Sequence, residues 1–280
     1  MCTSTAKLIV IIAATFGTSV ALAAQKTYDK RLNAPPGGGL TFQADVGSVS
    51  VVGGDAAEVV VHADLEGSEA FLSDFHISAE QTSSGVTILA RKSHRDWSDT
   101  GPTRVRFTIQ VPRNYRVDLQ TSGGGLDVRD LNAAVRAQTS GGGVQVQNVA
   151  GTVNARTSGG RIEVADSTGD LDLKTSGGGI DIRNDDGKVE ARTSGGGIQA
   201  QLRANHGIDL RTSGGTIIVQ LPQDTRASVD AETSGGRVTS QFPISATQIG
   251  DRNHLQGTIG GGGPPISLNT SGGNIRLEPR

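Results

Sequence analysis

From residue 117 onward, hydrophobic positions alternate with polar ones in short runs that recur along the chain. One apolar–polar–apolar triplet precedes each glycine-rich turn and another follows it, as in Val117-Asp118-Leu119 and Leu126-Asp127-Val128. Period-two alternation with β-branched residues is typical of strands, and no helical period is visible in this region. The pattern predicts two short strands and two turns in each repeat.

The turn between these triplets carries a Thr-Ser-Gly-Gly string, and its first five copies follow one another at intervals of 18 residues. Such a period is typical of solenoids, whose units bury their apolar faces by stacking on one another. The threonines are in phase with the apolar positions, so we expect an inward column. We expect the glycines to serve a positive φ or a close backbone approach. The column consists of Thr121, Thr139, Thr157, Thr175, Thr193, Thr212, Thr233 and Thr270.

The predicted fold is all-β: a single-chain parallel β-solenoid with coils of about 18 residues and a diverged N-terminal cap. Within the cap, Ser68 to Phe75 predicts a short helix with Ser68 as its N-cap, and residues 76–90 predict a hairpin. Thr270 to Leu277 is expected to be a last half-coil. The expected divisions are a signal peptide (1–23), a linker (24–39), a β-rich cap (40–116) and the solenoid (117–280).

Residues 1–23 are expected to direct export. Lys7 is their only charge, Leu8 to Ala14 form an apolar core, and Ala21-Leu22-Ala23 fits a cleavage site. The apolar run is short for a membrane span, so no integral membrane segment is expected after cleavage. The single cysteine, Cys2, lies in this segment, which leaves the mature chain without disulfide or thiolate chemistry. The expected location is the periplasm, the cell surface or the medium.

The repeats, the export signal and the Val111-Pro112 strand end together resemble the bacterial putative-adhesin domain family of unknown function. The shared coil has the form apolar–x–apolar–x–Thr-Ser-Gly-Gly-x–apolar–x–apolar, and the match runs from about Leu40 to Leu277. The resemblance implies a β-solenoid of the envelope or cell surface with no known enzymatic activity.

A row of cations is expected on one outer face of the solenoid, because the residue before the threonine is basic in four successive repeats. These residues are Arg156, Lys174, Arg192 and Arg211. An acidic row, Asp172, Glu190 and Asp209, lies two residues earlier in the sequence. The rows are compatible with a solvated ion-pair ladder or with a surface that binds an anionic polymer. The net charge of −2 gives no reason to expect a nucleic-acid partner.

A second outward column follows the glycines and suggests two other chemistries: calcium binding and glycan cleavage. The column reads Asp127, Gln145, Glu163, Asp181 and Gln199. Calcium binding needs clustered carboxylates, and the glutamines at two positions make this column a poor calcium site. Glu163 and Asp181 could act as acid and base in a glycan-cleaving enzyme, but a soluble solenoid needs outward carboxylates anyway. The five histidines lack metal-ligand spacing, and Trp97 could stack on a ligand or pack under the cap.

The sequence therefore favours a non-enzymatic exported protein, either an adhesin or a binder of an envelope or matrix polymer. No catalytic residue, metal or cofactor is predicted, and the oligomeric state is left open. The alternatives are a carbohydrate-active solenoid enzyme, such as a polysaccharide lyase or hydrolase, and a periplasmic envelope-stress scaffold that binds a protein partner.

Overall fold

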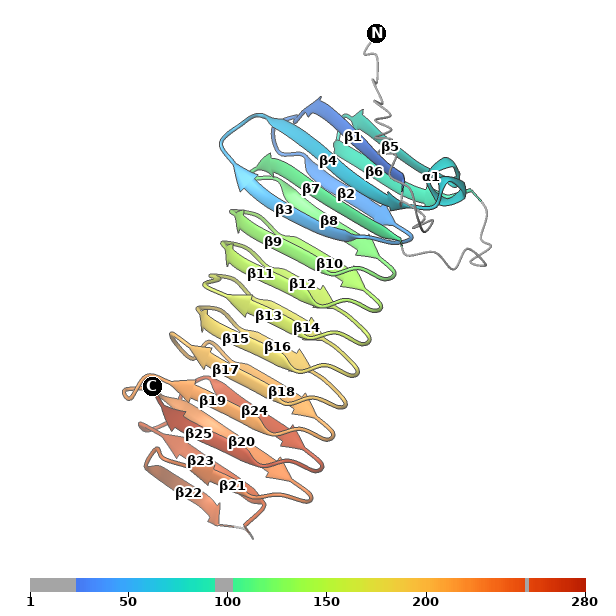
Figure 1. The fold of residues 1–280 in the computed structure, drawn as a ribbon. Helices are drawn as coiled ribbons and strands as arrows, with labels where there is room; N and C mark the ends of the chain where they lie inside the picture. The colour runs from blue at the N-terminus through green and yellow to red at the C-terminus, as the bar shows by residue number, and fades with distance from the viewer. Residues whose placement is uncertain (1–23, 94–102, 250–251) are drawn as a thin grey trace.

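The computed structural model describes residues 24–93, 103–249 and 252–280, which form a long stack of coils with a broader N-terminal end (Figure 1). Two sheets run along the stack: sheet A has 12 strands and sheet B has 13. The predicted signal peptide and Trp97 lie outside the described residues. No described helix is long and apolar enough to cross a membrane.

The coil region alternates strictly between the two sheets, with one strand of each coil in each sheet. Sheet B takes β8 (Arg116–Thr121), β10 (Val135–Thr139), β12 (Val153–Arg156), β14 (Leu171–Lys174), β16 (Val189–Arg192) and β18 (Ile208–Thr212). Sheet A takes β9 (Leu126–Leu131), β11 (Val144–Val149), β13 (Ile162–Ala165), β15 (Ile180–Asp185), β17 (Ile198–Leu202) and β19 (Ile217–Leu221). Successive coils pair in parallel and in register, Val135 with Val153 for example, which confirms the predicted fold class.

The predicted triplets place their apolar residues between the sheets, where they form one continuous buried core. The eight threonines are buried at the end of this core. Each Thr Oγ1 donates to a glycine carbonyl oxygen of the adjacent coil at 2.7–3.2 Å. The column therefore supplies a hydrogen bond to a backbone acceptor that the sheets leave unpaired.

The second glycine of each string is required by close backbone approach and not by a positive φ. A Cβ at Gly178 would overlap the carbonyl of Gly160 in the preceding coil, and the same holds at Gly160 against Gly142. By contrast, the φ of neither residue lies in the left-handed region. The corner can therefore stack at strand spacing only while this position lacks a side chain.

The cap consists of seven strands and one helix. They are β1 (Ala24–Asn33), β2 (Gly39–Ala44), β3 (Ser48–Gly54), β4 (Glu58–Gly67), α1 (Glu69–Asp74), β5 (Phe75–Thr82), β6 (Gly85–Lys92) and β7 (Arg104–Pro112). The predicted helix is confirmed, since Ser68 Oγ accepts from the Phe71 N–H at 3.0 Å. The β5–β6 hairpin is also confirmed.

The expected linker over residues 24–39 is wrong for most of its length, because it contains β1. This strand pairs antiparallel with β4 from Ala24 to Asn33. Tyr28 and Leu32 pack against the core. An unpaired β4 would expose a long row of backbone donors and acceptors, and β1 covers it.

The C-terminal coil was expected at the end of the stack, but it lies between two other coils. It comprises β24 (Pro265–Thr270) and β25 (Ile275–Pro279), which is a full coil and not a half-coil. On one side it pairs with β18 and β19, and on the other with β20 (Ala227–Thr233) and β21 (Val238–Ser240). A hairpin of β22 (Ile244–Ile249) and β23 (His254–Ile259) then completes sheet B.

Candidate binding surface

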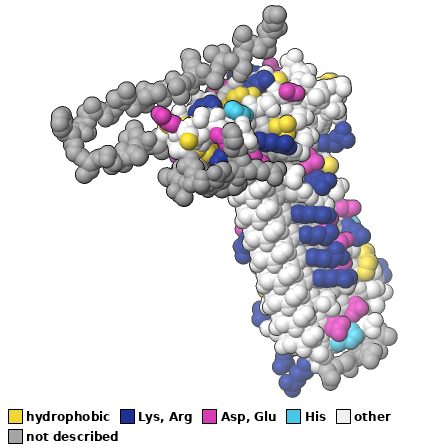
Figure 2. Space-filling view, turned by 90° about the vertical axis from the view of Figure 1, so that its right-hand side faces the viewer, with side chains coloured by type: hydrophobic (Ala, Val, Ile, Leu, Met, Phe, Trp, Pro, Cys, Tyr) yellow, Lys and Arg dark blue, Asp and Glu magenta, His cyan; other side chains and the backbone are white. Residues whose placement is uncertain are grey.

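The four predicted cations lie on the outer face of sheet B, one on each of β12, β14, β16 and β18. Strand register places Arg156 beside Lys174, Lys174 beside Arg192, and Arg192 beside Arg211. Side chains alternate between the two faces of a strand, and the residues directly before and after each cation are buried, so the cations point outward. Figure 2 shows Lys and Arg side chains stacked along the coil region. Parallel pairing therefore converts an 18-residue repeat into a straight row of charges.

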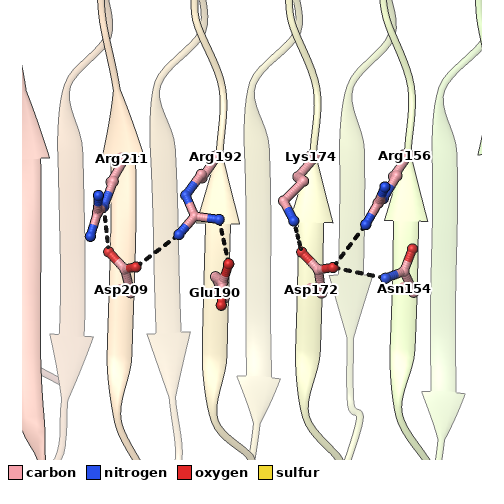
Figure 3. Close-up of polar contacts among 8 residues, drawn as sticks. All are labelled: Asn154, Arg156, Asp172, Lys174, Glu190, Arg192, Asp209 and Arg211. Carbon is pink, nitrogen blue, oxygen red and sulfur yellow. Dashed lines mark hydrogen bonds and ion pairs between the residues drawn. The ribbon is translucent and has the colours of Figure 1, made fainter.

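The acidic row neutralises most of this charge. Asp172 pairs with Arg156 at 3.2 Å and with Lys174 at 2.9 Å (Figure 3). Two coils further on, Asp209 pairs with Arg192 at 3.1 Å and with Arg211 at 2.9 Å. Arg192 also pairs with Glu190. We call these seven residues the charged ladder: Arg156, Lys174, Arg192, Arg211, Asp172, Glu190 and Asp209.

The ladder fixes the direction of its side chains more than it stabilises the fold. Partial burial disfavours the charged form of Asp172, but hydrogen bonds from Lys174 and Arg156 outweigh this effect and lower its pKa below the ordinary value. The cations remain 35–55% exposed, so each pair contributes about 0–1 kcal/mol to folding. Four cations and three carboxylates leave a net charge of +1.

On the opposite face, sheet A carries the second predicted column. Arg183 pairs with Asp181 at 3.1 Å and with Glu163 at 3.9 Å, and Arg161 lies 3.5 Å from Glu163. Within the described residues, no group of three or more His, Cys, Asp or Glu could hold a metal ion. The arrangement is again one of paired surface charges.

Three histidines lie beside carboxylates. His206 contacts Asp186 at 2.8 Å, and His254 contacts Asp230 at 3.1 Å. His62 lies between Asp29 at 2.7 Å and Asp64 at 3.1 Å, and its hydrogen bond to Asp29 raises its pKa. The two carboxylates beside His62 therefore stabilise its charged imidazolium form.

Two shallow grooves lie where the cap meets the coils, and the sequence analysis did not predict either one. The groove on sheet B has a volume of about 450 Å³ and runs from the β5–β6 turn to Asn154. The groove on sheet A has about 460 Å³ and extends from Ser48 to Glu163. Their sequence signal is a small residue before most of the apolar triplets that border them, as at Gly39, Gly85, Ser48 and Gly125.

The sequence analysis also did not predict a column of Asp and Asn residues at the other turn of each coil, the one without the Thr-Ser-Gly-Gly string. Asp130, Asn148, Asp166 and Asn184 all have a positive φ, between 53° and 61°. Asn148 donates to Asp130 at 2.6 Å, and Asn184 donates to Asp166 at 3.2 Å. These residue types tolerate the left-handed conformation, and their 18-residue spacing was a readable signal. This column of Asp and Asn residues shapes the turn.

The coils, the capped ends and the polar outer faces define a single-chain parallel β-solenoid of the repeat-protein class. The chain belongs to the Toastrack DUF4097 family, a bacterial family of unknown function whose model matches residues 49–278, and this confirms the predicted resemblance. No curated protein matches the chain.

Several solved structures resemble the protein at low sequence identity. A Bacteroides fragilis protein described as a "putative adhesin" is 13% identical, covers 91% of this chain and 97% of its own, and has a TM-score of 0.51. A Clostridium sporogenes "putative cell adhesion protein" is 14% identical, with 91% and 100% covered and a TM-score of 0.33. A Parabacteroides distasonis "putative lipid binding protein" is 12% identical, with 90% and 96% covered and a TM-score of 0.48. The likeness to the Bacteroides fragilis protein is one of fold.

Proposed function

We propose that this protein is an exported, non-enzymatic solenoid that presents a rigid polar face to an envelope or matrix polymer, as an adhesin does. The charged ladder carries this proposal, because it repeats the same polar groups on four successive coils in register. A polymer that lies along the coil axis could meet equivalent groups at each step of roughly 4.8 Å. Weak contacts then add up along the chain, as in multivalent binding.

The ladder suits a polymer with modest negative charge. Its net charge of +1 attracts anions only weakly, whereas the ion pairs keep donors and acceptors oriented. Such a preorganised surface loses little side-chain freedom on binding. A hydroxylated polymer with scattered acidic groups fits this pattern best.

The proposed absence of catalysis is supported by the contacts of the candidate acid–base pair. Glycoside hydrolysis by two carboxyl groups needs both of them to face the scissile bond. Glu163 and Asp181 instead both pair with Arg183.

Location is tested first. Intact cells and opened cells are treated with protease, and the mature chain is then detected in both samples and in the untreated medium. Digestion on intact cells, or recovery from the medium, is the result expected of a surface or matrix binder. Protection until the envelope is opened would eliminate adhesion at the cell surface.

The ladder is then tested with purified protein and isolated envelope polysaccharide. Successive Arg156→Glu, Lys174→Glu, Arg192→Glu and Arg211→Glu changes should each weaken binding by about threefold to tenfold. Arg276→Glu on sheet A is the matched control, because Arg276 is also exposed and outward. Thermal unfolding verifies that each variant folds. Unchanged binding after all four reversals would remove the ladder from the proposal.

A further inference from the structure

We propose that the groove on sheet B is a recognition site for an acidic saccharide unit, a sugar that carries a carboxylate. The inference rests on the proposed polymer-binding function and names the chemistry that this face selects. It is carried by the groove and by two arginines in it that have no partner in the described structure.

The groove crosses five strands at the junction of cap and coils: β6, β2, β8, β10 and β12. It is hollow because the residue that precedes the apolar triplet is small on four of these five strands: Gly85, Gly39, Ala134 and Thr152. On the central strand, β8, Arg116 occupies this position. The β5–β6 turn closes the cap end, where Thr82 Oγ1 and Ser84 Oγ lie 3.0 Å apart. The other end opens onto the coils at Asn154.

Arg116 and Arg136 are exposed on the wall of this groove. Neither forms an ion pair or a side-chain hydrogen bond with any described residue, in contrast to the paired cations of the charged ladder. Asp118 lies between them in the sequence and stands beside Arg136 in strand register, yet it is also unpaired within the described chain. A ligand can therefore bind both guanidinium groups without first displacing a carboxylate.

The side chains of the groove carry the chemical groups that bind an acidic sugar. A guanidinium group binds a carboxylate through two parallel hydrogen bonds. Thr41, Thr87 and Thr152 supply hydroxyl groups beside them, and the Asp118 carboxylate can accept hydrogen bonds from sugar hydroxyls. The apolar residues of the floor, such as Leu40 and Val135, are themselves buried.

The groove is continuous with the charged ladder. Asn154 lines its open end and donates to Asp172 of the ladder at 2.8 Å. An acidic polysaccharide could thus place one charged unit between Arg116 and Arg136 and continue along the ladder. A free acidic sugar would present the same carboxylate and hydroxyl groups as one unit of such a polysaccharide. Comparing a tetramer with its monomer as ligands distinguishes the polysaccharide from the free sugar.

The experiment measures binding of purified mature protein to tetragalacturonate and to galacturonic acid by calorimetry, with maltotetraose and inorganic phosphate as comparison probes. Tetragalacturonate should bind more tightly than the other three if the ligand is an extended acidic glycan. Equal binding of tetragalacturonate and galacturonic acid would assign the groove to a free acidic sugar. Maltotetraose or phosphate binding as tight as that of the acidic sugars, or no binding of either acidic sugar, would overturn the proposal.

Arg116→Ala and Arg136→Ala should each raise the dissociation constant about threefold to tenfold, and the double variant should abolish measurable binding. Arg276→Ala is the matched control, since it removes the same charge from an outward strand position on the other sheet. If the double variant binds as the wild type does, the groove is not the site. The polymer-binding function is judged separately, because the ladder reversals leave Arg116 and Arg136 intact.

Discussion

Asp185 should make the solenoid less stable as the pH rises toward neutrality, which is opposite to the usual behaviour of a paired carboxylate. Its side chain points into the core with 0% exposure, at a place where the neighbouring coils carry Ser167 and Leu202. Neither carboxylate oxygen has a hydrogen-bond partner within the hydrogen-bond distance and angle limits among the described residues. The N–H of Asp186 donates instead to the Ser167 carbonyl oxygen at 3.1 Å.

Burial raises the pKa of Asp185 from its ordinary value of 3.8 to about 7. The nearby N–H of Asp186 and, less strongly, the charge of Arg203 oppose this rise, whereas the charges of Asp186 and Asp170 add to it. At about 1.4 kcal/mol for each tenfold change, the rise corresponds to about 4 kcal/mol. The folded state binds this proton more tightly than the unfolded state, so stability from this group is present near pH 4 and is lost as pH rises to about 7.

Asp185→Asn removes the titration and keeps the shape of the side chain. The free energy of unfolding of the variant minus that of the wild type should grow by up to about 4 kcal/mol between about pH 4 and pH 8. Urea unfolding across this pH range measures the difference, in which the titrations of all other groups cancel. Asp224→Asn, at an exposed turn position, is the control. Parallel curves for Asp185→Asn and the wild type would refute the reasoning, because they would mean that the buried carboxylate costs nothing to ionise.

Two further predictions concern the corners of the coils. Gly178→Ala should destabilise the protein by about 2–3 kcal/mol, because its Cβ meets the Gly160 carbonyl. Gly177→Ala, whose Cβ would lie at an ordinary 3.5 Å, should be nearly neutral in the same thermal unfolding assay, and equal losses would contradict the packing argument. Thr175→Val should cost about 1–2 kcal/mol by removing the 2.9 Å hydrogen bond to Gly160, whereas Thr175→Ser should recover most of it. A valine variant as stable as the wild type in urea unfolding would show that the buried carbonyl needs no donor.

The coils could be predicted from sequence because each is specified locally. Period-two triplets set the inward face, and the Thr-Ser-Gly-Gly string marks the corner and hence the register. The cap was harder to predict because its strands pair with distant segments. The Ala24–Asn33 strand alternates only weakly between apolar and polar residues, so the Pro-Pro-Gly-Gly-Gly run that follows it at residues 35–39 led to the prediction of a linker.

The candidate surface was only half predictable for a related reason. Register alone places Arg156, Lys174, Arg192 and Arg211 in one row, since each stands before the repeated threonine. Whether a cation is paired depends on diagonal contacts between coils, as between Arg156 and Asp172, and these follow from side-chain conformation. The unpaired Arg116 and Arg136 could not be told from paired arginines by sequence pattern.

The order of the coils follows from long-range pairing, which the repeat leaves undetermined. β18 and β20 are consecutive sheet B strands in sequence, yet they pair with opposite sides of β24 and not with each other. In the same way, β2 lies between β6 and β8 at the other end. All coils offer the same backbone groups and the same threonine contact, so periodicity alone permits either order. Among the described strands of sheet B, β20 is joined to β18 through β24, so this sheet can be continuous only once the coil of residues 265–279 has inserted.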